Sequence, residues 1–220
     1  MSLVEFAAAK ALASSAVFLF ITVLLIAAAK RTSTCIALFA AQCAVIAVQI
    51  VALAYLHRSR EALVVAAMVL LVKVLAIPCA LLQIRRRLNV PVGIIASTTA
   101  AQSVFIASAL ILLAFAVVQP YARAFALDSE MLAAATAVVL TGAFLMVSRK
   151  KALMQVIGLL VLENGIFLAA LTTTFGMPLV VEMGIFFDLL MCVLLMGVFV
   201  FRIRDTFEHV DVSKLRRLRG

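Results

Sequence analysis

Four charged residues interrupt long apolar stretches of the chain, and their types suit proton chemistry. They are Lys73, Glu163, Glu182 and Asp188. If these stretches are membrane helices, Lys73, Glu163 and Asp188 would each lie roughly 15 Å deep, near the bilayer midplane. Glu182 would lie nearer the outer surface. A charge at the bilayer centre costs ~2.5–3.5 kcal/mol, so three retained charges indicate a role.

Two interpretations of these charges stay open at this point. Lys73 could neutralise Glu163 or Asp188 and so hold two helices together. However, the acids at depth outnumber the bases, which leaves one carboxyl over, and chains of Asp, Glu and Lys at this depth are typical of proton paths. We therefore predict a proton path through Lys73, Glu163, Asp188 and Glu182.

Other site chemistry is not indicated by the sequence. The two histidines, His57 and His209, both lie in polar segments, which argues against haem ligation within the membrane. No Cys-x-x-Cys pair, glycine-rich phosphate loop or Ser-His-Asp set lies in the apolar stretches. We predict no catalytic residue, no cofactor and no metal site. The cysteines are expected to be small buried apolar residues: Cys35, Cys43, Cys79 and Cys192.

The elements that must position these charges are long apolar helices. Hydrophobic residues make up 67% of the 220 residues, charged residues only 13%, and the mean hydropathy is +1.26. A soluble domain is ~45–50% apolar and ~25% charged, which excludes a soluble fold of this size. We predict an all-α, polytopic membrane bundle of about seven transmembrane helices. The expected spans are 5–29, 34–56, 62–84, 92–118, 131–147, 152–174 and 178–201.

Uncharged polar residues and glycines within the spans predict helix packing. Gln42, Gln49 and Gln102 are interpreted as hydrogen-bonding residues between helices, and Asn164 suits the same role. Gly158 and Gly165 are seven residues apart and share a helix face, so a neighbouring helix can approach closely there.

The basic residues predict the orientation in the membrane. An outside N-terminus and a cytoplasmic C-terminus place 14 Lys and Arg residues in inside segments and 4 in outside segments. The formal charge of +9 therefore reflects orientation signals, and we expect no nucleic-acid binding.

With these residues identified, the chain resembles hydrogenase-4 component E. The resemblance covers the chain from Lys30 to Gly220 and is carried by segments 72–78, 158–165, 178–188 and 211–220. The Glu-Asn-Gly piece in 158–165 and the Val-Glu-x-Gly-x-x-x-Asp piece in 178–188 are its most specific parts.

The last three expected helices also resemble the K subunit of respiratory complex I, which has a glutamate in each of its second and third helices. Asp188 falls about where the second glutamate would be. Glu163 departs from that pattern, because it follows Gly158 by five residues where the subunit's glutamate follows a glycine by two. The implied regions are 1–130, a four-helix membrane region; 131–204, the K-subunit-like region; and 205–220, a cytoplasmic tail.

The resemblance implies a membrane subunit of a group 4, hydrogenase-4 or formate hydrogenlyase-like oxidoreductase complex. Such a subunit is non-catalytic, has no redox centre of its own and lies in a bacterial or archaeal cell membrane. Its partners would be the lipid bilayer and other membrane subunits, including antiporter-like ones. Two alternatives remain open, a standalone secondary cation/proton transporter and a purely structural scaffold whose charges only pair.

Overall fold

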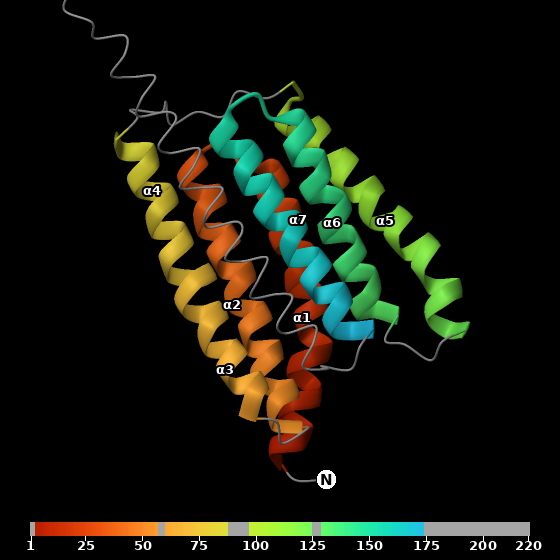
Figure 1. Ribbon diagram of the computed structural model, residues 1–220. Coiled ribbons are helices and arrows are strands. Elements are labelled where there is room, and N and C mark those ends of the chain that lie inside the picture. Colours follow the sequence, from red (N-terminus) through yellow and green to blue (C-terminus); the bar gives the residue numbers. More distant parts are fainter. Residues whose placement is uncertain (1–2, 57–59, 88–96, 125–128, 174–220) are drawn as a thin grey trace, which may run out of the picture.

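The computed structural model describes residues 3–56, 60–87, 97–124 and 129–173, and every regular element of these residues is a helix (Figure 1). Long apolar runs form helices because a helix satisfies its own backbone hydrogen bonds without water. The helices are α1 (Leu3–Ala28), α2 (Thr32–Leu56), α3 (Arg60–Val69), the π-helix η1 (Leu70–Ala76), α4 (Ile77–Arg87), α5 (Ala100–Ala124), α6 (Ser129–Ser148) and α7 (Ala152–Thr173).

Five helical segments of the described residues are long and apolar enough to cross a membrane. These are Thr32–Ala52, Leu63–Arg86, Ala100–Ala122, Ser129–Ser148 and Ala152–Thr173, and a shorter apolar helix covers Ser15–Ala28. The helical fold class and these five spans confirm the coarse prediction. The expected seventh span, 178–201, and the tail, 205–220, lie outside the described residues, so the count of seven stays a prediction.

The fourth expected span, 92–118, was placed wrongly. Its helix, α5, begins at Ala100 and runs past Pro120 to Ala124. The start is fixed by a capping box: the Thr99 N–H donates to Gln102 Oε1 at 2.9 Å, and the Gln102 N–H donates to Thr99 Oγ1 at 3.3 Å. Gln102 is therefore an exposed cap residue of the first turn, and the prediction that it bonds between helices was wrong.

Removing this cap should destabilise the start of α5. The variant Thr99→Ala loses the hydroxyl that accepts the Gln102 N–H, so we expect the free energy of unfolding to fall by about 1 kcal/mol. Denaturant unfolding in detergent measures this change. Thr99→Ser keeps the hydroxyl and serves as the control, and an equal loss in both variants would contradict the assignment.

The helices α3, η1 and α4 follow one another without a break and form one continuous rod, which contains a wide turn that positions Lys73. Its middle, η1, is π-helical, and the Ile77 N–H bonds to the carbonyl of Val72, five residues earlier. The turn lies just before Pro78, which lacks an N–H and whose ring would clash with the carbonyl four residues before it in an α-helix. Widening the turn relieves that clash, and such π segments often occur at functional sites.

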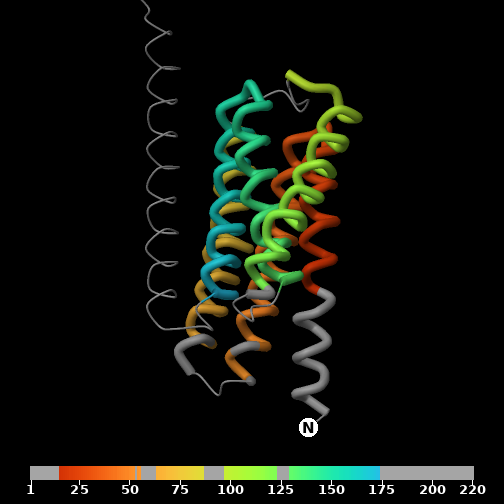
Figure 2. The backbone as a smooth tube through the Cα atoms, turned by 90° about the vertical axis from the view of Figure 1, so that its right-hand side faces the viewer, coloured from red at the N-terminus to blue at the C-terminus, as the bar shows by residue number. Residues whose placement is uncertain are grey.

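The rods pack as two rows of three. One row holds α1, α2 and the α3–η1–α4 rod, and the other holds α5, α6 and α7. Helix α1 packs against α5 and α6 of the opposite row, and α2 packs against α7 (Figures 1 and 2). The apolar core between the rows is made of residues from most of these helices, among them Leu19, Val23, Phe39, Val138, Leu160 and Leu168.

Helices α6 and α7 make the closest approach, and three glycines allow it. A Cβ added at Gly142 would lie 2.5 Å from the backbone N of Leu162. A Cβ at Gly165 would lie 2.6 Å from the backbone N of Val139, and one at Gly158 would lie 2.8 Å from the backbone N of Met146. The predicted packing role of Gly158 and Gly165 is confirmed.

The basic clusters of the described residues share one end of the bundle. Lys30 and Arg31 join α1 to α2, Arg149 to Lys151 join α6 to α7, and Arg85 and Arg86 lie in the last turns of α4. Figure 1 shows these helix ends together at the top. Which side of the membrane this end faces, and hence the orientation of the two termini, stays a prediction.

Candidate functional site: a buried ion pair and its polar neighbours

The structure brings together two of the predicted site residues in a buried ion pair. Lys73 on η1 and Glu163 on α7 are 3% and 5% exposed, and Lys73 Nζ lies 3.3 Å from Glu163 Oε1. The sequence left open whether Lys73 pairs with Glu163 or with Asp188. The structure shows the pair with Glu163, whereas Asp188 and Glu182 lie outside the described residues.

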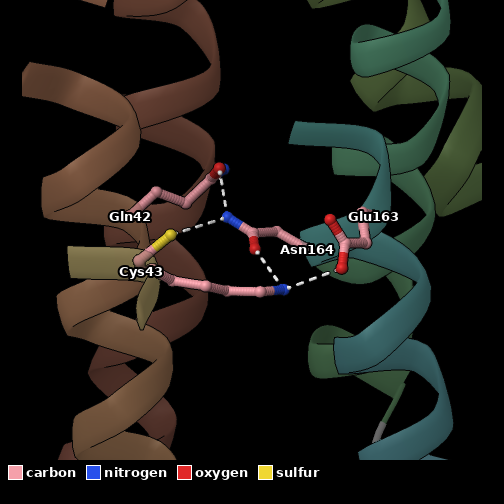
Figure 3. Close-up of polar contacts among 5 residues, drawn as sticks. Gln42, Cys43, Glu163 and Asn164 are labelled. Atoms are coloured by element: carbon pink, nitrogen blue, oxygen red, sulfur yellow. Dashed lines mark hydrogen bonds and ion pairs between the residues drawn. The ribbon is translucent and has the colours of Figure 1, made fainter. Parts of the chain in front are cut away.

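The ion pair is tied to α2 by an amide. Asn164 Oδ1 accepts a hydrogen bond from Lys73 Nζ at 3.3 Å. Asn164 Nδ2 donates to Gln42 Oε1 at 3.3 Å and to Cys43 Sγ at 3.2 Å (Figure 3). Because one amide both accepts and donates, it carries a continuous line of polar contacts from α7 to α2.

An aromatic ring completes the surroundings of the ammonium. Lys73 Nζ lies 5.6 Å from the centroid of the Phe167 ring, within the range of a cation–π contact. Phe167 lies one turn after Glu163 on α7, so both side chains reach the same face. The ammonium thus contacts a carboxylate, an amide oxygen and a ring, all from α7.

The sequence did not predict every neighbour of the ion pair. The contact of Phe167 with Lys73 was missed, because an aromatic residue in an apolar span is usually a packing residue. Cys43 was expected to be a buried apolar residue; it is buried, but its sulfur accepts a hydrogen bond.

The other cysteines were also expected to be buried. Cys35 is buried, Cys79 is exposed, contrary to expectation, and Cys192 lies outside the described residues. The bonding role predicted for Gln42 and Asn164 is confirmed.

A second polar contact lies on the same helix, α2. Gln49 is 1% exposed, and its Nε2 donates to Ser15 Oγ on α1 and to Met131 Sδ on α6, the latter at 3.4 Å. The bonding role predicted for Gln49 is confirmed as well. These contacts join three helices at a level different from that of the ion pair.

Arg149 behaves unlike an orientation signal. It is only 4% exposed, and its Nη2 donates to the carbonyl of Ala27 in the last turn of α1 at 2.8 Å. A cation at this position satisfies a helix-end carbonyl that has no partner within the helix. Burial lowers the pKa of Arg149, and the nearby Cys35 acts in the opposite direction. The sequence pattern of Arg149 within a basic cluster gave no sign of this burial.

No group of three or more His, Cys, Asp or Glu side chains that could hold a metal ion occurs in the part of the chain that the structure describes.

The spans and the buried pair define the chain as a helical integral membrane protein with a charged contact inside its helix bundle. Comparison with known proteins adds relatives. The chain is 27% identical over 203 residues to hydrogenase-4 component E of Escherichia coli K12, which covers 92% of this chain and 94% of that protein. The protein of the same name from Shigella flexneri gives the same values.

A shorter match has a higher identity. The chain is 41% identical over 120 residues to a protein of Mycobacterium tuberculosis named Uncharacterized protein Rv0085. This match covers 54% of each chain, about half the length of that relative. No protein-family model matches the chain, and no solved structure is significantly similar to it. The resemblance to hydrogenase-4 component E is therefore supported by distant similarity, whereas the likeness to the complex I K subunit stays a prediction.

Proposed function

We propose that this chain is a non-catalytic membrane subunit of a hydrogenase-4-like, group 4 oxidoreductase complex and that its intramembrane charges form part of a proton path. The observation that carries the proposal is the buried Lys73–Glu163 pair, bonded through Asn164 to Gln42. The similarity to hydrogenase-4 component E along 92% of the chain supports the kind of complex.

The geometry suits stepwise proton transfer. A proton that reaches Glu163 neutralises the carboxylate and so weakens the compensation of the buried Lys73 ammonium charge. Such a charge is costly in a low-dielectric interior, which favours release of a proton from Lys73 and so a net movement across the pair. Asp188 and Glu182 would continue the path on the remaining predicted span.

The test uses a variant in which both charges are removed together. We expect Lys73→Met/Glu163→Gln to assemble, because neither charge is left without its partner, but to translocate protons several-fold less per substrate oxidised. Acidification of membrane vesicles and the amount of assembled complex are measured side by side. Glu130→Gln, an exposed acid at the start of α6, is the control.

The outcomes separate the proposal from its alternatives. Unchanged proton translocation by an assembled double variant would assign the pair to scaffolding. Purification of the native chain from the bacterial or archaeal cell membrane should recover other membrane subunits with it, including antiporter-like ones. Recovery of the chain alone, with transport activity, would support a standalone cation/proton transporter instead.

A further inference from the structure

One face of α2 carries a polar residue every seven positions. Cys35, Gln42 and Gln49 are spaced by seven, which is within about 20° of two full turns, so they share a face of the helix. All three are at most 1% exposed. A buried face in a membrane bundle is expected to be apolar, so three polar residues in line require an explanation.

Helix α1 presents matching polar residues to this face. Ser15 and Thr22 are also seven apart, and α1 runs antiparallel to α2. Ser15 Oγ accepts a hydrogen bond from Gln49 Nε2, and the same register brings Thr22 to the level of Gln42. We call these four residues the α1–α2 polar seam: Ser15, Thr22, Gln42 and Gln49.

The seam contains buried polar atoms that lack partners. Gln42 Nε2 and Gln49 Oε1 have no hydrogen-bond partner within the described residues. Thr22 Oγ1 donates to the Leu19 carbonyl at 2.9 Å, which leaves its lone pairs as acceptors. An unsatisfied buried polar group costs about 1–3 kcal/mol, and internal water is the usual partner of such groups.

The length of helix between Gln42 and Gln49 matches a short water chain. Seven residues of α2 span about 10.5 Å. Hydrogen-bonded oxygens are ~2.8 Å apart, so a chain of about three water molecules has the length of this helix segment. A donor at one end, an acceptor at the other and two hydroxyls alongside give each water the two or more polar partners that it needs.

We propose that bound water fills the α1–α2 polar seam and extends the proton path from the Lys73–Glu163 pair toward the end of the bundle opposite the basic clusters. Gln42 joins the seam to the pair through Asn164, and Gln49 and Ser15 end it near the start of α6. Gln42 and Gln49 are then positioning residues that hold the water in line. The presence of water is inferred from the seam residues alone, whereas the transfer of protons along that water rests on the proposed function.

The first experiment detects the water directly. Radiolytic hydroxyl labelling of the full chain in membranes oxidises side chains that touch bound water. Met131, whose sulfur contacts Gln49, should be oxidised several-fold faster than Met154, which is also buried. Gln49→Leu should reduce the rate at Met131 to that at Met154. Equal rates at the two methionines in the unmodified chain would overturn the proposal.

The second experiment tests the path. In assembled complex, Gln49→Leu should lower proton translocation several-fold, and Gln49→Asn, which keeps the amide, should restore most of it. Gln83→Leu, at an exposed glutamine of α4, is the control and should have no effect. Labelling of Met131 with unchanged translocation in Gln49→Leu would overturn the path. An unmodified complex that moves no protons would refute the proposed function, while the labelling would still decide whether water fills the seam.

Discussion

Replacement of Glu163 by glutamine is expected to lower the free energy of unfolding by about 3–5 kcal/mol, because it removes the carboxylate that faces the buried Lys73 ammonium. The amide oxygen and the aromatic ring that Lys73 also contacts carry no full charge. Unfolding of the purified chain in detergent, followed by helix content against denaturant, measures the loss. A change of this size would exceed that of most single substitutions.

Two further variants measure the interaction between Lys73 and Glu163 as a double-mutant cycle. Lys73→Met alone should also be destabilising, since it leaves the Glu163 carboxylate buried. The double variant Lys73→Met/Glu163→Gln should recover most of either loss, because a neutral pair carries little desolvation cost. Losses that simply add in the double variant would show that the two charges do not interact. Glu130→Gln, at an exposed site, should change stability by less than about 1 kcal/mol.

The second large effect is expected at the α6–α7 contact. In an exposed helix, alanine is more favourable than glycine by about 1 kcal/mol. At Gly142 the sign should reverse, because the added Cβ meets the backbone N and Cα of Leu162 at 2.5 and 2.7 Å. Backbone atoms of a packed helix yield less readily than a flexible side chain. We expect Gly142→Ala to cost about 1–3 kcal/mol and Gly142→Leu to cost more.

Leucine introduced at an exposed position on the outside of the helix bundle provides the comparison. Ala116 is exposed on α5, so Ala116→Leu adds the same side chain without a clash and should stay within about 0.5 kcal/mol of the unmodified chain. Denaturant unfolding in detergent measures both variants. If Gly142→Leu were as stable as Ala116→Leu, α6 and α7 could not be as close as described.

The sequence predicted the bounds of several helices well. The spans that match α2, α6 and α7 agree with the structure within about two residues at each end. The prediction failed for α5, because hydropathy gave no sign of the capping box at Thr99, where the helix begins. Hydropathy reports what tolerates lipid, whereas a capping box reports where backbone hydrogen bonding begins.

The candidate site was predictable in kind but not in geometry. Charges at equal depth indicated that Lys73 has an acidic partner, and the structure identifies Glu163. Residue spacing could not choose between Glu163 and Asp188, because it gives the face and level within one helix but not which helices adjoin. The burial of Arg149 was missed for a similar reason, since its partner is a backbone carbonyl of α1 more than a hundred residues away.

The π-helical turn before Pro78 has a consequence for the history of the gene. A π turn holds one residue more than the α turn that it replaces, so η1 has the form of a single-codon insertion into an ordinary helix. Removing one residue from it would rotate the two flanking segments by about 100° relative to each other. Lys73 and the residues before it would then face a different neighbour. Homologous genes that lack this lysine are expected to be one codon shorter here, and sequence alignments should place a gap between codons 70 and 76.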